Sequence, residues 1–203
     1  MRGMAVFIVL TMTASAVAGD DDSQPSVGKV AKRAVSPVAV ARSAAGAAIN
    51  QGLNIPHEWG QGAEGYSRRV GSSFGAHLVK IGIQYPLARL FHEEFGYQRS
   101  NKTGFKARFF YALEATVITH KTTTEQATVS KSEIGGAVGA GLISRVWEPA
   151  SERAIFHGFI AAGTMMGADA GGNVLREFWP EISRKFHHKH QPSAAIPAAG
   201  QRE

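Results

Sequence analysis

The stretch that decides the expected fold is Ala154–Pro180, AIFHGFIAAGTMMGADAGGNVLREFWP. Three of its glycines recur every four residues, which on a helix gives one bare ridge: Gly163, Gly167 and Gly171. Three polar residues recur at the same spacing and would line roughly the opposite side: Asp169, Asn173 and Glu177. We call these two sets the glycine ridge and the polar file. Together they predict a helix that is buried in a bundle and touches a neighbour closely along its glycines.

Glycines with the same spacing occur in two other segments: Gly71 with Gly75, and Gly135 with Gly139. Glycine costs about 1 kcal/mol per position inside a helix, so tight packing must offset that cost. Ser130 and Glu133 have the spacing of a capping box and predict where the second of these helices begins. We therefore expect an all-α protein, a compact bundle of about four to six helices whose glycine-rich faces pack closely.

The segment from Pro56 to Pro86 has a clear helical period. Its apolar residues recur every three or four positions and predict one buried stripe: Tyr66, Val70, Phe74, Leu78, Ile81 and Tyr85. Pro86 is expected to kink or restart this helix, because proline lacks the amide donor and clashes with the preceding turn. A second helical piece should then run from Leu87 to Phe95.

The other expected elements are shorter. An alanine-rich helix is expected from Ser36 to Asn50, and an aromatic helix from Phe105 to Ala115. Two β-branched runs at 116–119 and 127–129 form either a small hairpin or a loop. Pro180 is expected to end the helix that holds the glycine ridge.

The ends of the chain differ in composition from its middle. Arg2, a short apolar run and small residues ending at Ala18 predict a secretory signal peptide, with Ala16 as the alternative cleavage site. The protein is therefore expected to be exported, to the periplasm or in association with the outer membrane. We expect a signal peptide, a disordered leader, a single helical domain and a basic, Ala/Pro-rich flexible tail over residues 1–18, 19–35, 36–182 and 183–203.

Composition limits the classes of function. The net charge of +6 over 203 residues is mild and spread along the chain, so nucleic acid is not indicated as a partner. Weak attraction to anionic membrane or polysaccharide surfaces fits better. Without cysteine, disulfides, thiolate metal sites and cysteine nucleophiles are excluded. The charge-free run 154–168 is shorter than the roughly 20 residues of a spanning helix, which favours a soluble or surface-bound bundle.

The polar file is the best candidate site. It forms either a buried structural network or a ligand site, and Asp169 is expected to pair with Arg68, Arg69 or Arg108. The weaker candidates are two pairs of neighbours at the ends of predicted helices: His57 with Glu58, an acid/base pair or a helix cap, and His92 with Glu93, interfacial charges. No resident metal or cofactor is expected, since three histidines of the tail offer only an adventitious site: His187, His188 and His190.

Several segments resemble an uncharacterised family of exported proteins common in soil Acidobacteria. They are Ala47–Gln51, Pro56–Tyr66, His92–Glu94, Tyr97–Arg99, Gly167–Asp169 and Glu177–Pro180, and the EWGQGAEGY piece is the most specific. The resemblance covers residues 45–182 and implies bacterial export and one domain. It carries over no catalytic residues, because the family has no assigned activity.

Two classes of function remain open. The first is a non-enzymatic envelope module that binds lipid, polysaccharide or another envelope protein. The second is a metal-assisted envelope hydrolase that uses histidines and carboxylates gathered from several helices. The sequence contains no recognisable nucleophile arrangement, and this favours the first class.

Overall fold

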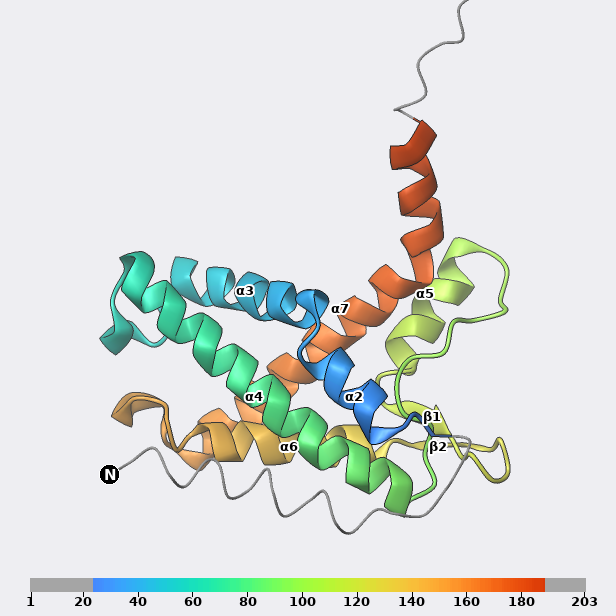
Figure 1. Ribbon diagram of the computed structural model, residues 1–203, viewed down its shortest axis with the longest axis horizontal. Coiled ribbons are helices and arrows are strands. Elements are labelled where there is room, and N and C mark those ends of the chain that lie inside the picture. The colour runs from blue at the N-terminus through green and yellow to red at the C-terminus, as the bar shows by residue number, and fades with distance from the viewer. Residues whose placement is uncertain (1–23, 189–203) are drawn as a thin grey trace, which may run out of the picture.

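The computed structural model describes residues 24–188, and helices make up most of this part of the chain (Figure 1). The elements in chain order are α2 Val27–Ala34, α3 Pro37–Gly52, a 3₁₀ turn His57–Trp59, α4 Gly62–Leu90, α5 Phe105–Glu114, β1 Ile118–His120, β2 Ala127–Val129, α6 Lys131–Ser144, a 3₁₀ turn Ala150–Glu152 and α7 Ile155–His188. The prediction of an all-α bundle with one small hairpin is confirmed. The predicted signal peptide at 1–18 lies outside the described residues.

The long helix α4 is the centre of the arrangement. It packs against α3 and α6, while α7 packs against α6 and α5 (Figure 1). The hairpin β1–β2 is antiparallel and pairs Ile118 with Val129 and His120 with Ala127. A β-bridge between Glu93 and Lys121 joins the hairpin to the segment that follows α4.

Pro86 and Pro180 both lie inside helices. The prediction that Pro180 ends its helix is wrong, while Pro86 does not interrupt α4, where the sequence predicted a kink or a restart. The helix α4 continues through Pro86 to Leu90, and α7 continues through Pro180 to His188. A proline removes one hydrogen bond and bends a helix without always ending it, and α7 changes direction in its C-terminal third (Figure 1). The helical piece expected from Leu87 to Phe95 ends at Leu90, because the chain turns at His92, where φ is 53°.

The segment predicted as a disordered leader also differs from its prediction. Its second part forms α2, which is anchored by two buried side chains, Val30 and Ala34. These two residues lie four positions apart on one face of the short helix, and this face packs against the bundle. Tyr85 of α4 supports the same region, since its hydroxyl donates a hydrogen bond of 2.8 Å to the carbonyl oxygen of Pro25.

The interior is built from small and polar side chains. Apart from Val30, Pro56 and Tyr85, every buried apolar residue in the described part of the chain is an alanine or a glycine. The stripe predicted on α4 is not the buried face, since only Tyr85 of that stripe is fully buried. The buried positions of α4 are instead Gly65, Arg69, Ala76, Lys80, Tyr85 and Ala88. Small side chains let helix axes approach closely, which fills the interior without large apolar groups.

Arg69 fixes the start of α4 and is almost completely buried. Its guanidinium donates hydrogen bonds to the carbonyl oxygens of Ile55, Pro56 and Gly60 at 2.7–2.8 Å. A Cβ at Gly65 would lie 2.7 Å from the carbonyl oxygen of Trp59, so the turn can fold this tightly only beside glycine. The other two glycines of the EWGQGAEGY piece, Gly60 and Gly62, have φ of 65° and 88°, a region that favours glycine.

The glycines of α6 lie at helix contacts. A Cβ on Gly135 or Gly139 would lie 2.7 Å and 2.6 Å, respectively, from the Cδ1 atoms of Leu87 and Ile83 on α4. The closest contact joins α6 to α7, where a Cβ on Gly141 would overlap the carbonyl oxygen of Gly158.

The glycine ridge of α7 does not pack against another helix, and the prediction that it does is wrong. All three residues of the ridge are exposed, and a Cβ on any of them would have no neighbour within 4 Å. Gly71 on α4 is equally open, while Gly75 makes only an ordinary contact of 3.7 Å with Trp147. The face of α7 that turns inward is the opposite one, which holds the polar file. Within residues 24–188, no helix combines the length and the apolar character needed to cross a membrane.

Candidate functional site

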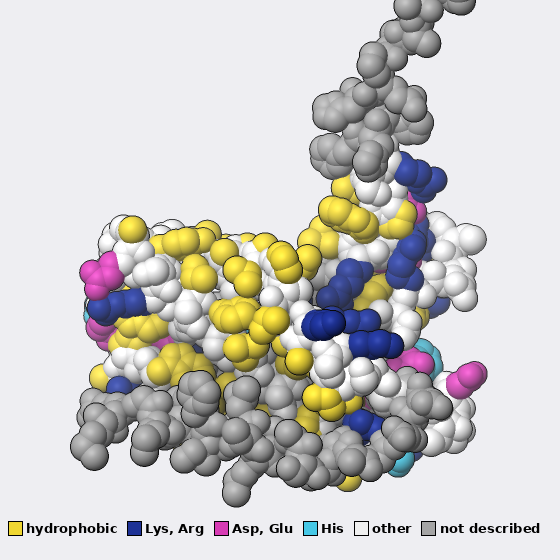
Figure 2. Space-filling view, in the orientation of Figure 1, with side chains coloured by type: hydrophobic (Ala, Val, Ile, Leu, Met, Phe, Trp, Pro, Cys, Tyr) yellow, Lys and Arg dark blue, Asp and Glu magenta, His cyan; other side chains and the backbone are white. Residues whose placement is uncertain are grey.

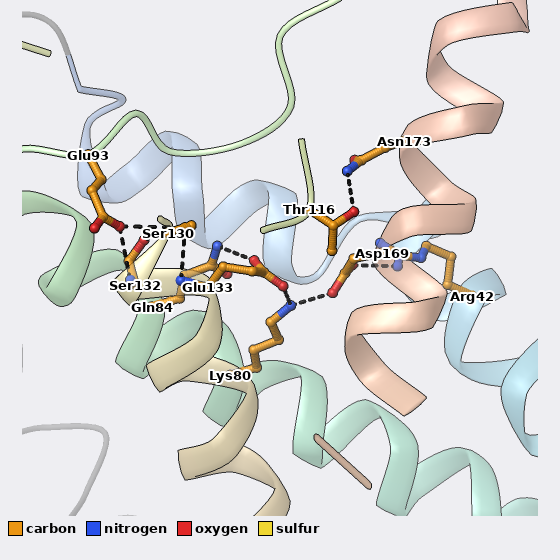
Figure 3. A network of polar contacts seen from close by, with 10 residues as sticks. All are labelled: Arg42, Lys80, Gln84, Glu93, Thr116, Ser130, Ser132, Glu133, Asp169 and Asn173. Carbon is orange, nitrogen blue, oxygen red and sulfur yellow. Dashed lines mark hydrogen bonds and ion pairs between the residues drawn. The ribbon is translucent and has the colours of Figure 1, made fainter. Parts of the chain in front are cut away.

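The polar file meets a lysine in the middle of the bundle (Figure 3). Lys80 of α4 donates hydrogen bonds to Asp169 of α7 and to Glu133 of α6. Gln84, one turn further along α4, donates to the second carboxylate oxygen of Glu133 at 2.6 Å, and Arg42 of α3 donates to Asp169 at 2.6 Å. Four helices are thus joined by one network of two carboxylates and two cations.

The charges of this network are balanced, but its two carboxyls experience different environments. Burial raises the pKa of Glu133, and the nearby Asp169 raises it further, although Lys80 opposes both. Burial also acts to raise the pKa of Asp169, but Lys80 and Arg42 together outweigh that effect and lower it. Asp169 is therefore the carboxylate that stays ionised, while Glu133 is the group that accepts a proton first as the pH falls.

His77 lies beside this network, one turn from Lys80 on α4. Burial lowers its pKa, and the positive charge of Arg42 lowers it further. Its Nε2 atom is buried and has no hydrogen-bond partner among the described residues. The imidazole is therefore neutral at pH 7 and adds no charge to the network.

Glu177, two turns after Asp169, belongs to a separate cluster. It is completely buried and accepts hydrogen bonds from the Tyr97 hydroxyl at 2.6 Å, from the Ser100 hydroxyl at 2.6 Å and amide at 3.1 Å, and from Arg108 Nε at 2.8 Å. Burial acts to raise the pKa of Glu177, but the hydrogen bonds outweigh it and lower the pKa to about 2. Burial and Glu177 together raise the pKa of Tyr97. This cluster fixes the segment before α5 onto α7.

Asn173 lies between the two carboxylates of the polar file and binds neither of them. Its amide nitrogen donates to the Thr116 hydroxyl at 3.2 Å, and both groups are buried (Figure 3). The three residues of the file share one face of α7, as the sequence predicted, but each contacts a different part of the bundle. The file therefore does not form one site.

Glu93 is almost completely buried and caps α6 from outside that helix. Its carboxylate accepts hydrogen bonds from the backbone amides of Lys131 at 3.0 Å and Ser132 at 2.9 Å. The first amides of a helix lack partners within the helix, and their dipole favours a negative charge. Ser130 adds the N-cap bond predicted from the sequence, since the backbone amide of Glu133 donates to the Ser130 hydroxyl oxygen at 3.3 Å. The side chain of Glu133 binds Lys80 instead of completing the capping box.

The remaining candidates lie on the surface. His92 is exposed, whereas Glu93, which follows it, is buried. His57 and Glu58 face each other at 3.4 Å in the 3₁₀ turn before α4. A hydrogen bond with Ser151 is the main cause that lowers the pKa of Glu58, and it links the two 3₁₀ turns of the chain. None of these residues contacts the polar file.

The partners predicted for Asp169 are wrong. Arg68 pairs with the exposed Glu64, Arg69 holds the turn before α4, and Arg108 pairs with Glu177 and Glu181. The residues that bind Asp169, Lys80 and Arg42, were missed. A signal for Lys80 exists, since Gly65, Arg69, Ala76 and Lys80 form a small and polar stripe at helical spacing beside the apolar one. Arg42 gives no comparable signal, because one arginine in an alanine-rich helix usually faces water.

An apolar pocket of about 330 Å³ lies between α5 and the C-terminal part of α7. It is lined by Phe105, Val174, Leu175, Phe178, Glu181 and Ile182, and none of the buried carboxylates opens into it. In the part of the chain that the structure describes, no three His, Asp or Glu side chains are grouped to hold a metal ion. The arrangement joins helices to one another through paired charges and hydrogen bonds.

No family model matches the chain, and neither a curated protein nor a solved structure matches it.

Proposed function

We propose that this protein is an exported, non-enzymatic helical module of the bacterial cell envelope that binds the surface of lipid bilayers. The observation that carries this proposal is the inverted placement of side chains on α3. Its buried residues are small: Ala39, Ser43 and Ala47. The large apolar side chains Val38 and Ile49 of this helix, and Leu53 directly after it, point outward and are 65%, 65% and 63% exposed.

The first half of α7 repeats this inversion. Gly158 and Ala162 face the bundle, while Phe156, Phe159 and Ile160 are exposed. On a helix of a soluble domain the large apolar side chains normally face the core, and an extended apolar surface marks a membrane or protein contact. Figure 2 shows hydrophobic side chains spread along α3 and over the neighbouring part of α4.

A bilayer fits this surface better than a polysaccharide does. Aliphatic and aromatic side chains gain about 1.5–3 kcal/mol each when they leave water, but they offer sugar hydroxyls no hydrogen bonds. A helix with one apolar outer face can lie in the interface plane with that face among the acyl chains. Cell-envelope placement is supported by the predicted signal peptide and by the resemblance to exported proteins of Acidobacteria.

The buried polar groups support a non-enzymatic role. The carboxylates of Glu133, Asp169 and Glu177 are each held by a cation of another helix, and Glu93 is held by backbone amides. Each of these groups stabilises the packing of one element on another. A metal-assisted hydrolase is the alternative, but no arrangement among the described residues favours it.

Flotation of the full chain with phosphatidylcholine vesicles tests this proposal. We expect the wild type to float with the vesicles. The double variant Ile49→Ser with Leu53→Ser should bind at least tenfold more weakly, because it lacks two apolar side chains that would enter the bilayer. The matched control is Val129→Ser with Val146→Ser, which alters two exposed apolar side chains on other elements. Wild-type protein that stays at the bottom of the gradient, both with these vesicles and with vesicles that contain an anionic phospholipid, would contradict the proposal.

A further inference from the structure

The short helix α2 presents only basic charge to the surface. Its exposed side chains include Lys29, Lys32 and Arg33, while Val30 and Ala34 fix the opposite face to the bundle. No acidic residue occurs between Ser23 and His57, so this charge is not neutralised from within the segment.

A second source of positive charge lies close to α2 in space, although it belongs to α7, far away in the sequence. Arg176 of α7 is exposed, and Arg33 and Arg42 lie close enough to it for their charges to lower its pKa. Partial desolvation is the largest cause of that lowering, and Asp169 only partly opposes the two arginines. Arg42 is engaged with Asp169. Neither Arg33 nor Arg176 forms a hydrogen bond or ion pair within residues 24–188. Figure 2 shows Lys and Arg side chains gathered where α2 approaches the second half of α7.

Large apolar side chains surround these cations. Leu175 and Trp179 flank Arg176 on α7 and are 59% and 61% exposed. Val35 and Val38 follow Arg33 in the turn from α2 to α3 and are equally open. Basic heads beside apolar side chains suit a membrane interface, where the apolar groups enter the acyl region and the cations stay at the phosphates. Tryptophan is itself enriched at this level of a membrane.

We propose that α2 and the second half of α7 form an anionic-phospholipid recognition surface, in which Lys29, Lys32, Arg33 and Arg176 contact headgroup phosphates and Trp179 inserts beside them. This proposal rests on the proposed lipid binding and adds the lipid class and the face that selects it. Guanidinium groups match phosphate oxygens in pairs, and two neighbouring unpaired ones favour a dianionic or densely anionic surface. A soluble polyanion would use the cations but would leave the apolar side chains in water.

The test compares flotation of the full chain with vesicles of phosphatidylcholine alone and with vesicles containing 30% phosphatidylglycerol. We expect phosphatidylglycerol to strengthen binding of the wild type, and 0.5 M NaCl to remove most of that gain by screening. Arg33→Gln with Arg176→Gln should reduce binding to anionic vesicles about tenfold or more, and leave binding to neutral vesicles unchanged. Lys29→Gln with Lys32→Gln, on an exposed face, should do the same even if the arginine pair disturbs folding.

The matched control is Arg68→Gln with Arg153→Gln, which removes the same charge at the other end of α4 and should bind like wild type. Equal binding of all variants to anionic vesicles would overturn the recognition surface, yet leave neutral-vesicle binding and the proposed function intact. Wild type that binds neither kind of vesicle would instead overturn the proposed function. Dextran sulfate bound as tightly as the anionic vesicles, at equal charge concentration, would show a general polyanion site and overturn the assignment to lipid.

Discussion

Arg108 and Glu177 are joined by two hydrogen bonds, from Arg108 Nε to the carboxylate at 2.8 Å and from its Nη2 to the backbone carbonyl oxygen at 2.6 Å. The guanidinium thus donates to both the side chain and the main chain of Glu177 on α7. Its third nitrogen, Nη1, donates to the Glu181 carboxylate at 2.7 Å. This contact ties α5 to α7, which otherwise meet across the pocket beside Phe105.

Acid should weaken the fold through Glu177. Its pKa is about 2 in the folded chain against an ordinary value of 4.5. The stabilisation is therefore fully present above pH 4.5 and is lost as the pH falls toward 2. We expect the free energy of unfolding to lose about 2 kcal/mol from this group between pH 7 and pH 3. Urea unfolding at several pH values measures it.

The control for this prediction is the variant Glu177→Gln. It should be less stable than wild type by about 3 kcal/mol at pH 7, because the partly buried Arg108 loses one of its two carboxylate partners. The difference between the two proteins should shrink toward pH 3. Glu64→Gln, in an exposed pair with Arg68, should change stability by less than about 0.5 kcal/mol. A constant difference across the pH range would contradict the role of Glu177.

Removing the external cap of α6 should also destabilise the bundle. In Glu93→Ala the amides of Lys131 and Ser132 lose their acceptor in a buried place, and we expect a cost of about 2 kcal/mol. Glu94→Ala is the matched control, because the neighbouring carboxylate is partly exposed and contacts only His120 at 3.9 Å. Equal unfolding midpoints for the two variants would show that Glu93 does not hold the helix.

Two glycine variants should have opposite effects. Gly167→Ala should raise stability by up to about 1 kcal/mol, because the added methyl meets no neighbour and alanine favours the helix. Gly141→Ala should lower stability by about 1–3 kcal/mol, since its methyl collides with the backbone of Gly158. Denaturant midpoints of both variants test this. A lower midpoint for Gly167→Ala would mean that the glycine ridge is covered in solution.

The sequence predicted the helices better than it predicted their orientation. Helical period and the cap at Ser130 depend on near neighbours in the chain, and both located helices well. Which face of a helix turns inward depends on partners distant in sequence. On α4 the apolar stripe from Tyr66 looked like the core face, but close packing of alanines and glycines placed Arg69 and Lys80 inside. The usual preference of large apolar side chains for the interior therefore gave the wrong face.

For the same reason, the sequence could not predict which residues pair with one another within the candidate site. The spacing of Asp169 and Glu177 placed both on the inward face of α7, but it held no information on which helix each would meet. Arg108 was identified as a partner of a carboxylate, and it binds Glu177 instead of Asp169. Lys80 was missed because a lysine inside a helical segment is rarely buried.

The last prediction concerns the ion pair between Lys80 and Asp169 at the centre of the bundle. Asp169→Asn should destabilise the fold by about 3 kcal/mol, because a nearly buried lysine loses one of its two carboxylates. Lys80→Met should cost at least as much, since it leaves both Glu133 and Asp169 with one fewer cation. In the double variant the losses should not add, because the second substitution removes a charge that the first left uncompensated. Urea unfolding of the four proteins at pH 7 gives the coupling free energy. Strictly additive losses would show that the two residues do not stabilise each other.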